Sequence, residues 1–454
     1  MPTRLSPLIA AVNAASSEYL LQSGSERIEA KITPVVYNNK QGLVDNYDAV
    51  RFAETYHGQS ILRESTIFYI ADYLELSSWG HIMDSWRYLS QSAFALLLGS
   101  RDKALHLAYY AELRAAIAIL AMSGICILKG KHFAIDQNGQ LYWFNGSTHE
   151  VTWAALTEWV DLANIHSYII DALDINNVLG IQWVDMNANA LSFAKDISKD
   201  WVKNWCVDIG KIKQDRTARN KVSYRPSIPE LATKPLMEKE LKIITTVNSV
   251  ISINENIKLL LACDFSNIAA KVKYINHPDF FWDGEYLSDV TNWLVNHNAK
   301  TYSLKDARKT ILDIKKTYTN DLSLLLESAS IGKKSACAVF SRAFFLLYLA
   351  SALILKHRNE LSSRSANGVI EWPDELIKQF GLNSQLWDQS SLPVDFSLLT
   401  NDTIDSIDDL EAYPKHFFGH AKSRCICGHS LWQSTAQELI DLCHLEKYFL
   451  VMSA

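Results

Sequence analysis

HLAYYAELRAAIAILAMSGI, from His106 to Ile125, is an alanine-rich segment whose apolar residues recur at helical spacing. Its small residues are Ala108, Ala111, Ala115 and Ala116. Alanine has no bulky side chain, so repeated alanines along a helix let a neighbouring helix approach closely. Tyr109 or Tyr110 can then fill the space beside them. The segment therefore predicts a core helix over about residues 102–121, within a bundle of packed helices.

The composition is that of a mainly α-helical globular protein. Among 454 residues, 17 are glycine and 10 are proline, too few for a loop-rich or all-β chain, and 48% are hydrophobic, enough for a large core. The length indicates two or three domains. The sequence contains no glycine-rich phosphate loop, nucleophile elbow or metalloprotease helix, which argues against an ATPase, a hydrolase or a dehydrogenase. No cofactor is expected.

Helical patterns also precede the alanine-rich segment, and one short stretch after it breaks them. Two helices are expected over about residues 61–76 and 79–98. HFAIDQNGQLYWF, about His132 to Phe144, alternates between apolar and polar residues and has Asn138-Gly139 at its centre. This pattern predicts a two-stranded hairpin closed by a type I′ turn.

A helix is expected directly after the hairpin, because Ser147 and Glu150 match the capping-box pattern. The second half of the chain is again helical in pattern, with a long helix over about residues 335–357. The helix after the hairpin is expected to bury Trp153, Leu156, Trp159 and Val160.

Prolines indicate where the domains divide. Pro226, Pro229 and Pro235 punctuate a linker-like stretch over about residues 224–235, where we place the main boundary. The predicted organisation is a lead-in over residues 1–60, a helical domain with the inserted hairpin over 61–230, a second helical domain over 236–400 and a tail over 401–454.

The Tyr-Tyr-Ala helix resembles a helix of the HEPN superfamily (higher eukaryote and prokaryote nucleotide-binding). The second mark of that family is an arginine, a polar residue, three further residues and a histidine on a later helix. Here Arg219, Asn220 and Tyr224 occupy those places. The resemblance implies an HEPN-like helical bundle, a two-fold homodimer and cleavage of RNA without a metal. In such ribonucleases the arginine holds the phosphate, and the histidine exchanges the proton of the ribose 2′-hydroxyl.

Tyr224 stands where that family has its histidine. A tyrosine titrates near about 10 and an imidazole near about 6.5, so Tyr224 is a poor general base at neutral pH, although it can hydrogen-bond a phosphate. A second match to the spacing, Arg101-Asp102 followed by His106, is intact. Arg101 could bind a phosphate at the helix start. Alternatively, Asp102 is an N-terminal charge and His106 an ordinary surface or core residue.

Residues 203–225 are basic within a chain of net charge −6. Seven basic and two acidic residues give the segment a local charge of +5, and Trp201, Trp205 and Tyr224 lie among them. Cations that pair with phosphates and rings that stack on bases suit single-stranded RNA; a solvated helix face is the alternative. The expected RNA-binding residues, besides the Arg-Asn motif, are Lys203, Lys211, Lys213, Arg216, Lys221 and Arg225.

The tail contains a cluster of potential zinc ligands: His416, His420, Cys425, Cys427 and His429. The Cys-x-Cys spacing is unusual for zinc, so a metal-free tail is the preferred interpretation. The seven scattered cysteines form no disulfide framework, which indicates a cytoplasmic setting. The most apolar runs, near residues 115–128 and 343–355, are shorter than the roughly 18–20 residues of a membrane span, so no membrane association is expected.

These observations lead to one principal hypothesis, an HEPN-like bacterial defence or toxin-type protein that binds RNA; whether it also cleaves RNA is left open by the sequence, and if it is an enzyme it is a metal-independent endoribonuclease. The alternative is a non-catalytic helical scaffold, a subunit of a multi-protein antiviral complex. The first hypothesis implies a homodimer, the second a heteromeric protein complex.

Overall fold

The structure of the chain is a computed structural model. It describes residues 6–23, 49–97, 100–162 and 335–364, together with positions 216, 217, 219, 220, 243, 244, 246, 247, 328 and 445. The described part is mainly α-helical with one small sheet, which confirms the predicted mainly α-helical class. The predicted boundary near residues 224–235 and the zinc candidates of the tail lie outside the described residues.

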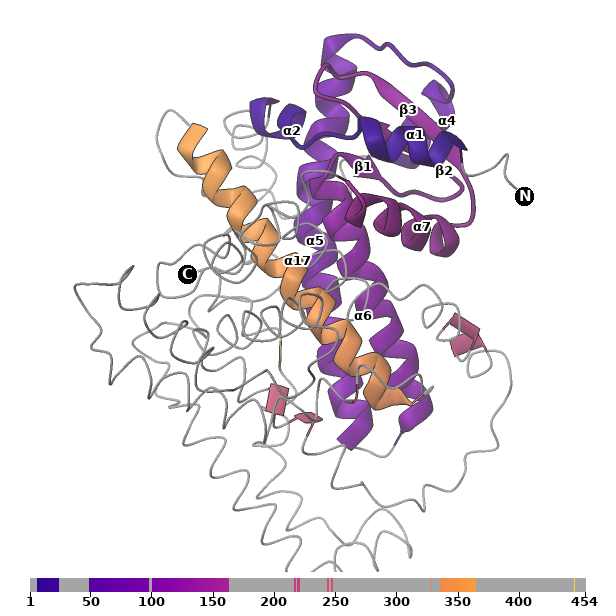
Figure 1. The fold of residues 1–454 in the computed structure, drawn as a ribbon, viewed down its shortest axis with the longest axis vertical. Helices are drawn as coiled ribbons and strands as arrows, with labels where there is room; N and C mark the ends of the chain where they lie inside the picture. Colours follow the sequence, from indigo (N-terminus) through magenta and orange to yellow (C-terminus); the bar gives the residue numbers. More distant parts are fainter. Residues whose placement is uncertain are drawn as a thin grey trace, which may run out of the picture.

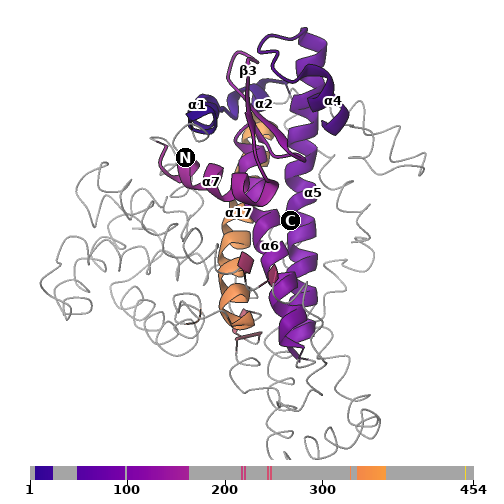
Figure 2. The same ribbon diagram turned by 90° about the vertical axis from the view of Figure 1, so that its right-hand side faces the viewer.

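Three long helices run side by side and form the core of the described part (Figure 1). They are α5 (Glu64–Leu97), α6 (Arg101–Met122) and α17 (Ala336–Arg364). α6 coincides with the predicted alanine-rich helix. Figure 2 shows α17 lying along α6 in a second view.

The alanines of α6 allow the close approach that the sequence predicts. Ser85 of α5 donates its hydroxyl hydrogen to the carbonyl oxygen of Ala111 over 2.6 Å. Ser92, two turns further along α5, donates in the same way to Ala104 over 2.8 Å. A side chain as short as serine can reach a backbone oxygen of the next helix only where the two backbones are close.

The two helices expected over residues 61–76 and 79–98 are one continuous helix, so the prediction of a break was wrong. Ser77 and Ser78, at the expected break, donate their hydroxyl hydrogens to the carbonyl oxygens of Leu74 and Glu75 in the preceding turn. Hydroxyls satisfied in this way do not compete for backbone groups in a non-helical conformation. Both serines are buried against neighbouring elements, which stabilises the helix through them.

α17 is anchored to α5 by buried polar contacts. The indole Nε1 of Trp86 donates to the hydroxyl of Ser351 over 3.1 Å. The Nε2 of His357 lies 2.7 Å from a carboxylate oxygen of Glu75. α17 lies in the range assigned to a second helical domain, yet it shares one core with α5 and α6.

α6 and the part of α17 up to Ser363 are long and apolar enough to cross a membrane by length and composition. This is weak evidence, because core helices pass the same test and most of each helix is buried inside the structure.

The sheet lies at one end of the long helices and contains the predicted hairpin (Figure 1). β2 (Lys131–Ile135) pairs antiparallel with β3 (Leu141–Asn145). A short strand that the sequence did not predict, β1 (Ile125–Cys126), pairs with the other edge of β2.

The turn of the hairpin differs from the predicted type I′ turn. The amide of Gly139 donates to the carbonyl of Asp136, and only the following residue, Gln140, returns to the ladder. Gly139 has a φ of +78°, so a three-residue loop ends in a left-handed glycine. The side chain of Asp136 accepts hydrogen bonds from the amides of Asn138 and Gln140. An aspartate at the first position of the turn therefore selects the longer loop, because its carboxylate satisfies two amides there.

Short helices complete the packing around the sheet. α1 (Ser6–Ala14) contacts β2 and β3, α2 (Glu18–Ser23) contacts α5, and α4 (Ala49–Tyr56) contacts β2. The core beneath the sheet is apolar and includes Phe52, Ile70 and Phe133. The lead-in thus contributes to the same core as the long helices.

α7 (Thr148–Val160) follows the hairpin, and Trp153, Leu156, Trp159 and Val160 are all buried as predicted. The predicted capping box is absent at this helix: the side chain of Ser147 makes no capping hydrogen bond. The carboxylate of Glu150 instead pairs with Arg216 at 2.8 Å. A tertiary ion pair has replaced the local interaction, and it brings residues 216–220 to the start of α7.

We predict that Gly124→Ala destabilises the protein much more than Gly130→Ala. Both glycines have a left-handed φ, +83° and +85°, so alanine at either position costs about 1–2 kcal/mol. A Cβ at Gly124 would also lie 2.7 Å from the carbonyl oxygen of Ser16, whereas a Cβ at Gly130 meets nothing within 4 Å. Overpacking adds about 1–3 kcal/mol at Gly124. Urea unfolding of the two variants measures the difference, and equal midpoints would contradict the predicted clash.

Candidate functional site

Arg219 is buried among aromatic rings of α6. Its side chain is 7% exposed, and its backbone is helical. The guanidinium carbon lies 5.2 Å from the ring centroid of Tyr109 and 5.5 Å from that of Tyr110. Both distances are within the range of cation–π attraction. The Tyr-Tyr step of α6 therefore forms the surface on which Arg219 rests.

His149, in the first turn of α7, joins the arginine to the tyrosines. Its Nε2 lies 3.2 Å from Nη2 of Arg219, and its Nδ1 lies 3.0 Å from the hydroxyl oxygen of Tyr109. A guanidinium can only donate, so Nε2 must be the unprotonated acceptor. In the neutral imidazole Nδ1 then carries the hydrogen and donates it to Tyr109. The two contacts together fix the tautomer and the orientation of the ring.

The electrostatics of the site keep both of its histidines neutral. Burial, and then the charge of Arg219, lower the pKa of His149, with a smaller effect from Arg216. Burial and Arg219 also lower the pKa of His106, whose ring lies 4.9 Å from that of Tyr110. Burial raises the pKa of the Tyr109 hydroxyl. At neutral pH His149, His106 and Tyr109 are therefore uncharged, and His149 presents a lone pair on Nε2.

Arg219 contacts no carboxylate within the part of the chain that the structure describes, and its buried Nε has no hydrogen-bond partner there. Glu150, the acidic residue next to His149, is paired with Arg216. Glu112, about one turn beyond Tyr109, helps to raise the pKa of that tyrosine. A buried arginine is normally paired with an acidic group. A guanidinium that has further N–H donors and lies beside a neutral base can bind an anion, and its geometry matches a phosphate particularly well.

The structure thus brings two of the predicted site residues together. Arg219 and His106 both lie close to the ring of Tyr110. Asn220 follows Arg219 and is half-buried. Arg101 is the first residue of α6, eight residues before Tyr109, or roughly 12 Å along the helix axis. It therefore lies at the start of the helix, about two turns from the Tyr-Tyr step.

The remaining predicted positions are divided. Arg216 is tied to Glu150, so it positions the segment at α7. Among the described residues no group of three or more His, Cys, Asp or Glu side chains could hold a metal ion. The other predicted residues lie outside the described part of the chain: Tyr224, Lys203, Lys211, Lys213, Lys221 and Arg225.

His149 is the functional residue that the sequence did not reveal. It lies 70 residues before Arg219, and no spacing links the two. One signal was present: a histidine in the first turn of a helix that directly follows a hairpin, where the chain reverses onto the neighbouring helix. Only the fold shows that this turn faces the Tyr-Tyr step.

We compared the chain with known proteins. No family model, no curated protein and no solved structure matches it.

We predict that Arg219→Met raises the pKa of His149, because a neighbouring positive charge disfavours the imidazolium form. Arg216→Met is the matched control and should raise it less, since Arg216 contributes least to the shift. Titration of ¹³C-labelled histidine by NMR measures both values, with the His149→Gln spectrum identifying the resonance. An unchanged pKa of His149 in Arg219→Met would show that the charge of Arg219 does not act on His149, which would contradict the prediction.

Proposed function

We propose that the chain binds RNA at the cluster of Arg219, His149, Tyr109 and Tyr110 and cleaves it without a metal, as an HEPN-like ribonuclease of the defence or toxin type. One observation carries the proposal: a buried guanidinium that contacts no carboxylate in the described chain donates to a neutral imidazole. Metal-free cleavage of RNA needs these two groups, a cation for the phosphate and a base for the ribose hydroxyl.

Binding would exchange one hydrogen bond for stronger ones. The N–H groups of Arg219 turn from His149 to two phosphate oxygens, since a charge-assisted, bidentate pair is stronger than a bond to a neutral ring. This exchange leaves the lone pair on Nε2 of His149 without its donor. The same event that fixes the phosphate therefore makes the base available.

In the cleavage step Nε2 of His149 takes the proton of the 2′-hydroxyl, and the 2′-oxygen forms a bond to phosphorus. The bond from phosphorus to the 5′-oxygen breaks, and that oxygen takes a proton from solvent. The products are a 2′,3′-cyclic phosphate and a 5′-hydroxyl, and the proton on His149 returns to solvent. Tyr109 accepts the Nδ1 hydrogen throughout, which stabilises the imidazolium. Arg219 stabilises the charge on the phosphoryl oxygens.

This assignment differs in one respect from what the family resemblance implies. There the histidine follows the arginine by four residues, and two protomers form the site. Here the base comes from α7 of the same chain as Arg219, so the proton-transfer group does not depend on Tyr224 or on a second protomer.

We predict that the purified chain cleaves single-stranded RNA or tRNA in the presence of a chelator. Substrates with 2′-deoxyribose should bind but resist cleavage. His149→Ala should lower the rate by about 10²–10⁴-fold, the range for loss of a general base. It should leave binding nearly intact, whereas Arg219→Ala should weaken both. Because the pKa of His149 lies below about 6.5, the rate should be flat from neutral pH upward and should fall only in acid.

Arg101→Ala provides the matched control, since it removes the same charge at the start of α6, roughly 12 Å along the helix axis from Tyr109. Gel analysis of end-labelled RNA and fluorescence anisotropy give the two readouts. If Arg219→Ala binds and cleaves like the unaltered chain, the proposal is wrong. Binding without cleavage in the unaltered chain would instead support the non-catalytic scaffold.

A further inference from the structure

A pair of tyrosines connects the Arg219 cluster with the surface of α5. The guanidinium of Arg219 lies 5.5 Å from the ring of Tyr110 on α6. That ring lies 5.6 Å from the ring of Tyr88 on α5, and the two helices run side by side (Figure 2). Tyr88 and Tyr110 are both half-buried, so the contact between them reaches solvent. The surface of α5 next to Tyr88 therefore adjoins the site proposed for phosphate.

This surface carries a cation and an aromatic ring on one face of the helix. Arg87, Gln91 and Phe94 are spaced by four and three residues, so they lie above one another, and all three are exposed. We call them the α5 face. The side chain of Phe94 is 39% exposed, and no other phenylalanine, tyrosine or tryptophan of the described residues is classed as exposed. Arg87 is the residue before Tyr88, which places the α5 face beside the tyrosine pair.

α6 adds a second cation on the side of its helix that bears Tyr110. Lys103 precedes His106 by three residues and Tyr110 by seven, so the three share one face of α6. Lys103 and Arg87 are both exposed, and neither forms an ion pair with an acidic side chain in the described part of the chain. Two cations on adjacent helices are therefore available to an anionic ligand.

The acidic residues closest in sequence do not cancel these cations. Asp84, one turn before Arg87, has a carboxylate oxygen 3.8 Å from Nε of Arg114. Asp102 directly precedes Lys103, so it lies roughly 100° around α6 from it. Cations that pair with phosphates, next to an exposed ring that stacks on a base, are the groups that bind single-stranded nucleic acid. A duplex keeps its bases stacked on one another and has none to place on Phe94.

We propose that the α5 face binds the continuation of a single-stranded RNA whose scissile phosphate lies at Arg219. The inference rests on the proposed function and names its substrate as an unpaired strand. Arg87 and Lys103 pair with phosphates that neighbour the one at Arg219, and one base stacks on Phe94. Phe94 follows Tyr88 by six residues, roughly 9 Å along α5, so the strand extends only a few nucleotides beyond the cleaved bond.

Fluorescence anisotropy of the full chain with a labelled single-stranded RNA tests the α5 face. Phe94→Leu keeps an apolar side chain but removes the ring. It should weaken binding at least about fivefold, because the loss of one base–aromatic stack costs about 1–3 kcal/mol. Phe94→Tyr should restore binding. Arg87→Gln should reduce the slope of log affinity against log salt by about 0.7, the value for one phosphate contact on a single strand. The same RNA annealed to its complement should bind more weakly and should not respond to Phe94→Leu.

The start of α5 supplies matched controls at the opposite end of the same helix. Arg63→Gln removes an exposed arginine there, 24 residues before Arg87. Ile61→Ala removes an apolar side chain that is 81% exposed. Both variants should bind the single-stranded RNA as the unaltered chain does, with the same salt dependence.

The outcomes separate this inference from the proposed function. If Arg219→Ala weakens RNA binding but Phe94→Leu and Arg87→Gln do not, the α5 face is wrong and the site at Arg219 stands. If no RNA binds to the unaltered chain, both are wrong. Light scattering identifies a second copy of the chain as the occupant instead: a dimer that becomes a monomer in Phe94→Leu, with unchanged affinity for RNA, would overturn the proposal.

Discussion

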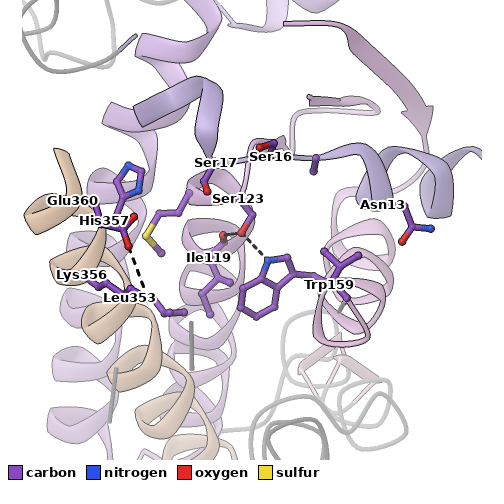
Figure 3. A pocket seen from close by; sticks show the side chains of 13 residues that line it. Asn13, Ser16, Ser17, Ile119, Ser123, Trp159, Leu353, Lys356, His357 and Glu360 are labelled. Carbon is purple, nitrogen blue, oxygen red and sulfur yellow. Dashed lines mark hydrogen bonds and ion pairs between the residues drawn. The ribbon is translucent and has the colours of Figure 1, made fainter. Parts of the chain in front are cut away.

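The described structure depends on the close contact between α5 and α6. Hydroxyls of Ser85 and Ser92 reach the backbone oxygens of Ala111 and Ala104, which only a helix face of small side chains permits. The two backbones cannot be so close and also accommodate large residues on both sides. The larger side chains of α6 therefore lie on its flanks. There Tyr109 contacts Arg219, and Ile119 lines a cavity of about 310 Å³ (Figure 3). The positions of the Arg219 cluster and of this cavity are therefore both determined by the way α6 packs against α5.

Burial of Arg219 in this cluster lowers the stability of the folded chain. Arg219 contacts no carboxylate in the described part of the chain, and the desolvation of a cation costs several kcal/mol in a protein interior. The two tyrosine rings return about 1–2 kcal/mol as cation–π attraction, and the bond to His149 about 1.5–3 kcal/mol. These contributions offset part of the cost without a counter-charge. A bound anion would offset the rest of the desolvation free energy of the guanidinium. This is the physical reason to interpret the cluster as an anion-binding site rather than as a structural contact.

Local patterns in the sequence were sufficient for the elements that are set by local chemistry. The alanine-rich helix, both strands of the hairpin and the buried side chains of α7 all lie where periodicity placed them. The predictions that were wrong concern side chains that can bond to more than one partner. The hydroxyls of Ser77 and Ser78 donate hydrogen bonds within the helix, and the carboxylate of Glu150 pairs with Arg216 instead of capping the N-terminus of its own helix. His149 belongs to the same class, because its partners are distant in the chain and only the packing of α7 on α6 unites them.

α6 and α7 each contribute to the Arg219 cluster and to the cavity lined by Ile119 and Trp159, and these shared helices limit how independently the two can behave. A helix transmits displacement along its axis, so a movement of Trp159 is also a movement of His149 at the other end of α7. The hydrogen bond from Trp159 to Ser123 ties the same end of α7 to α6. If a ligand in the cavity changes the affinity of the Arg219 cluster for phosphate, then phosphate must change the affinity of the cavity by the same factor. The coupling, whatever its sign, can therefore be measured from either end of the bundle.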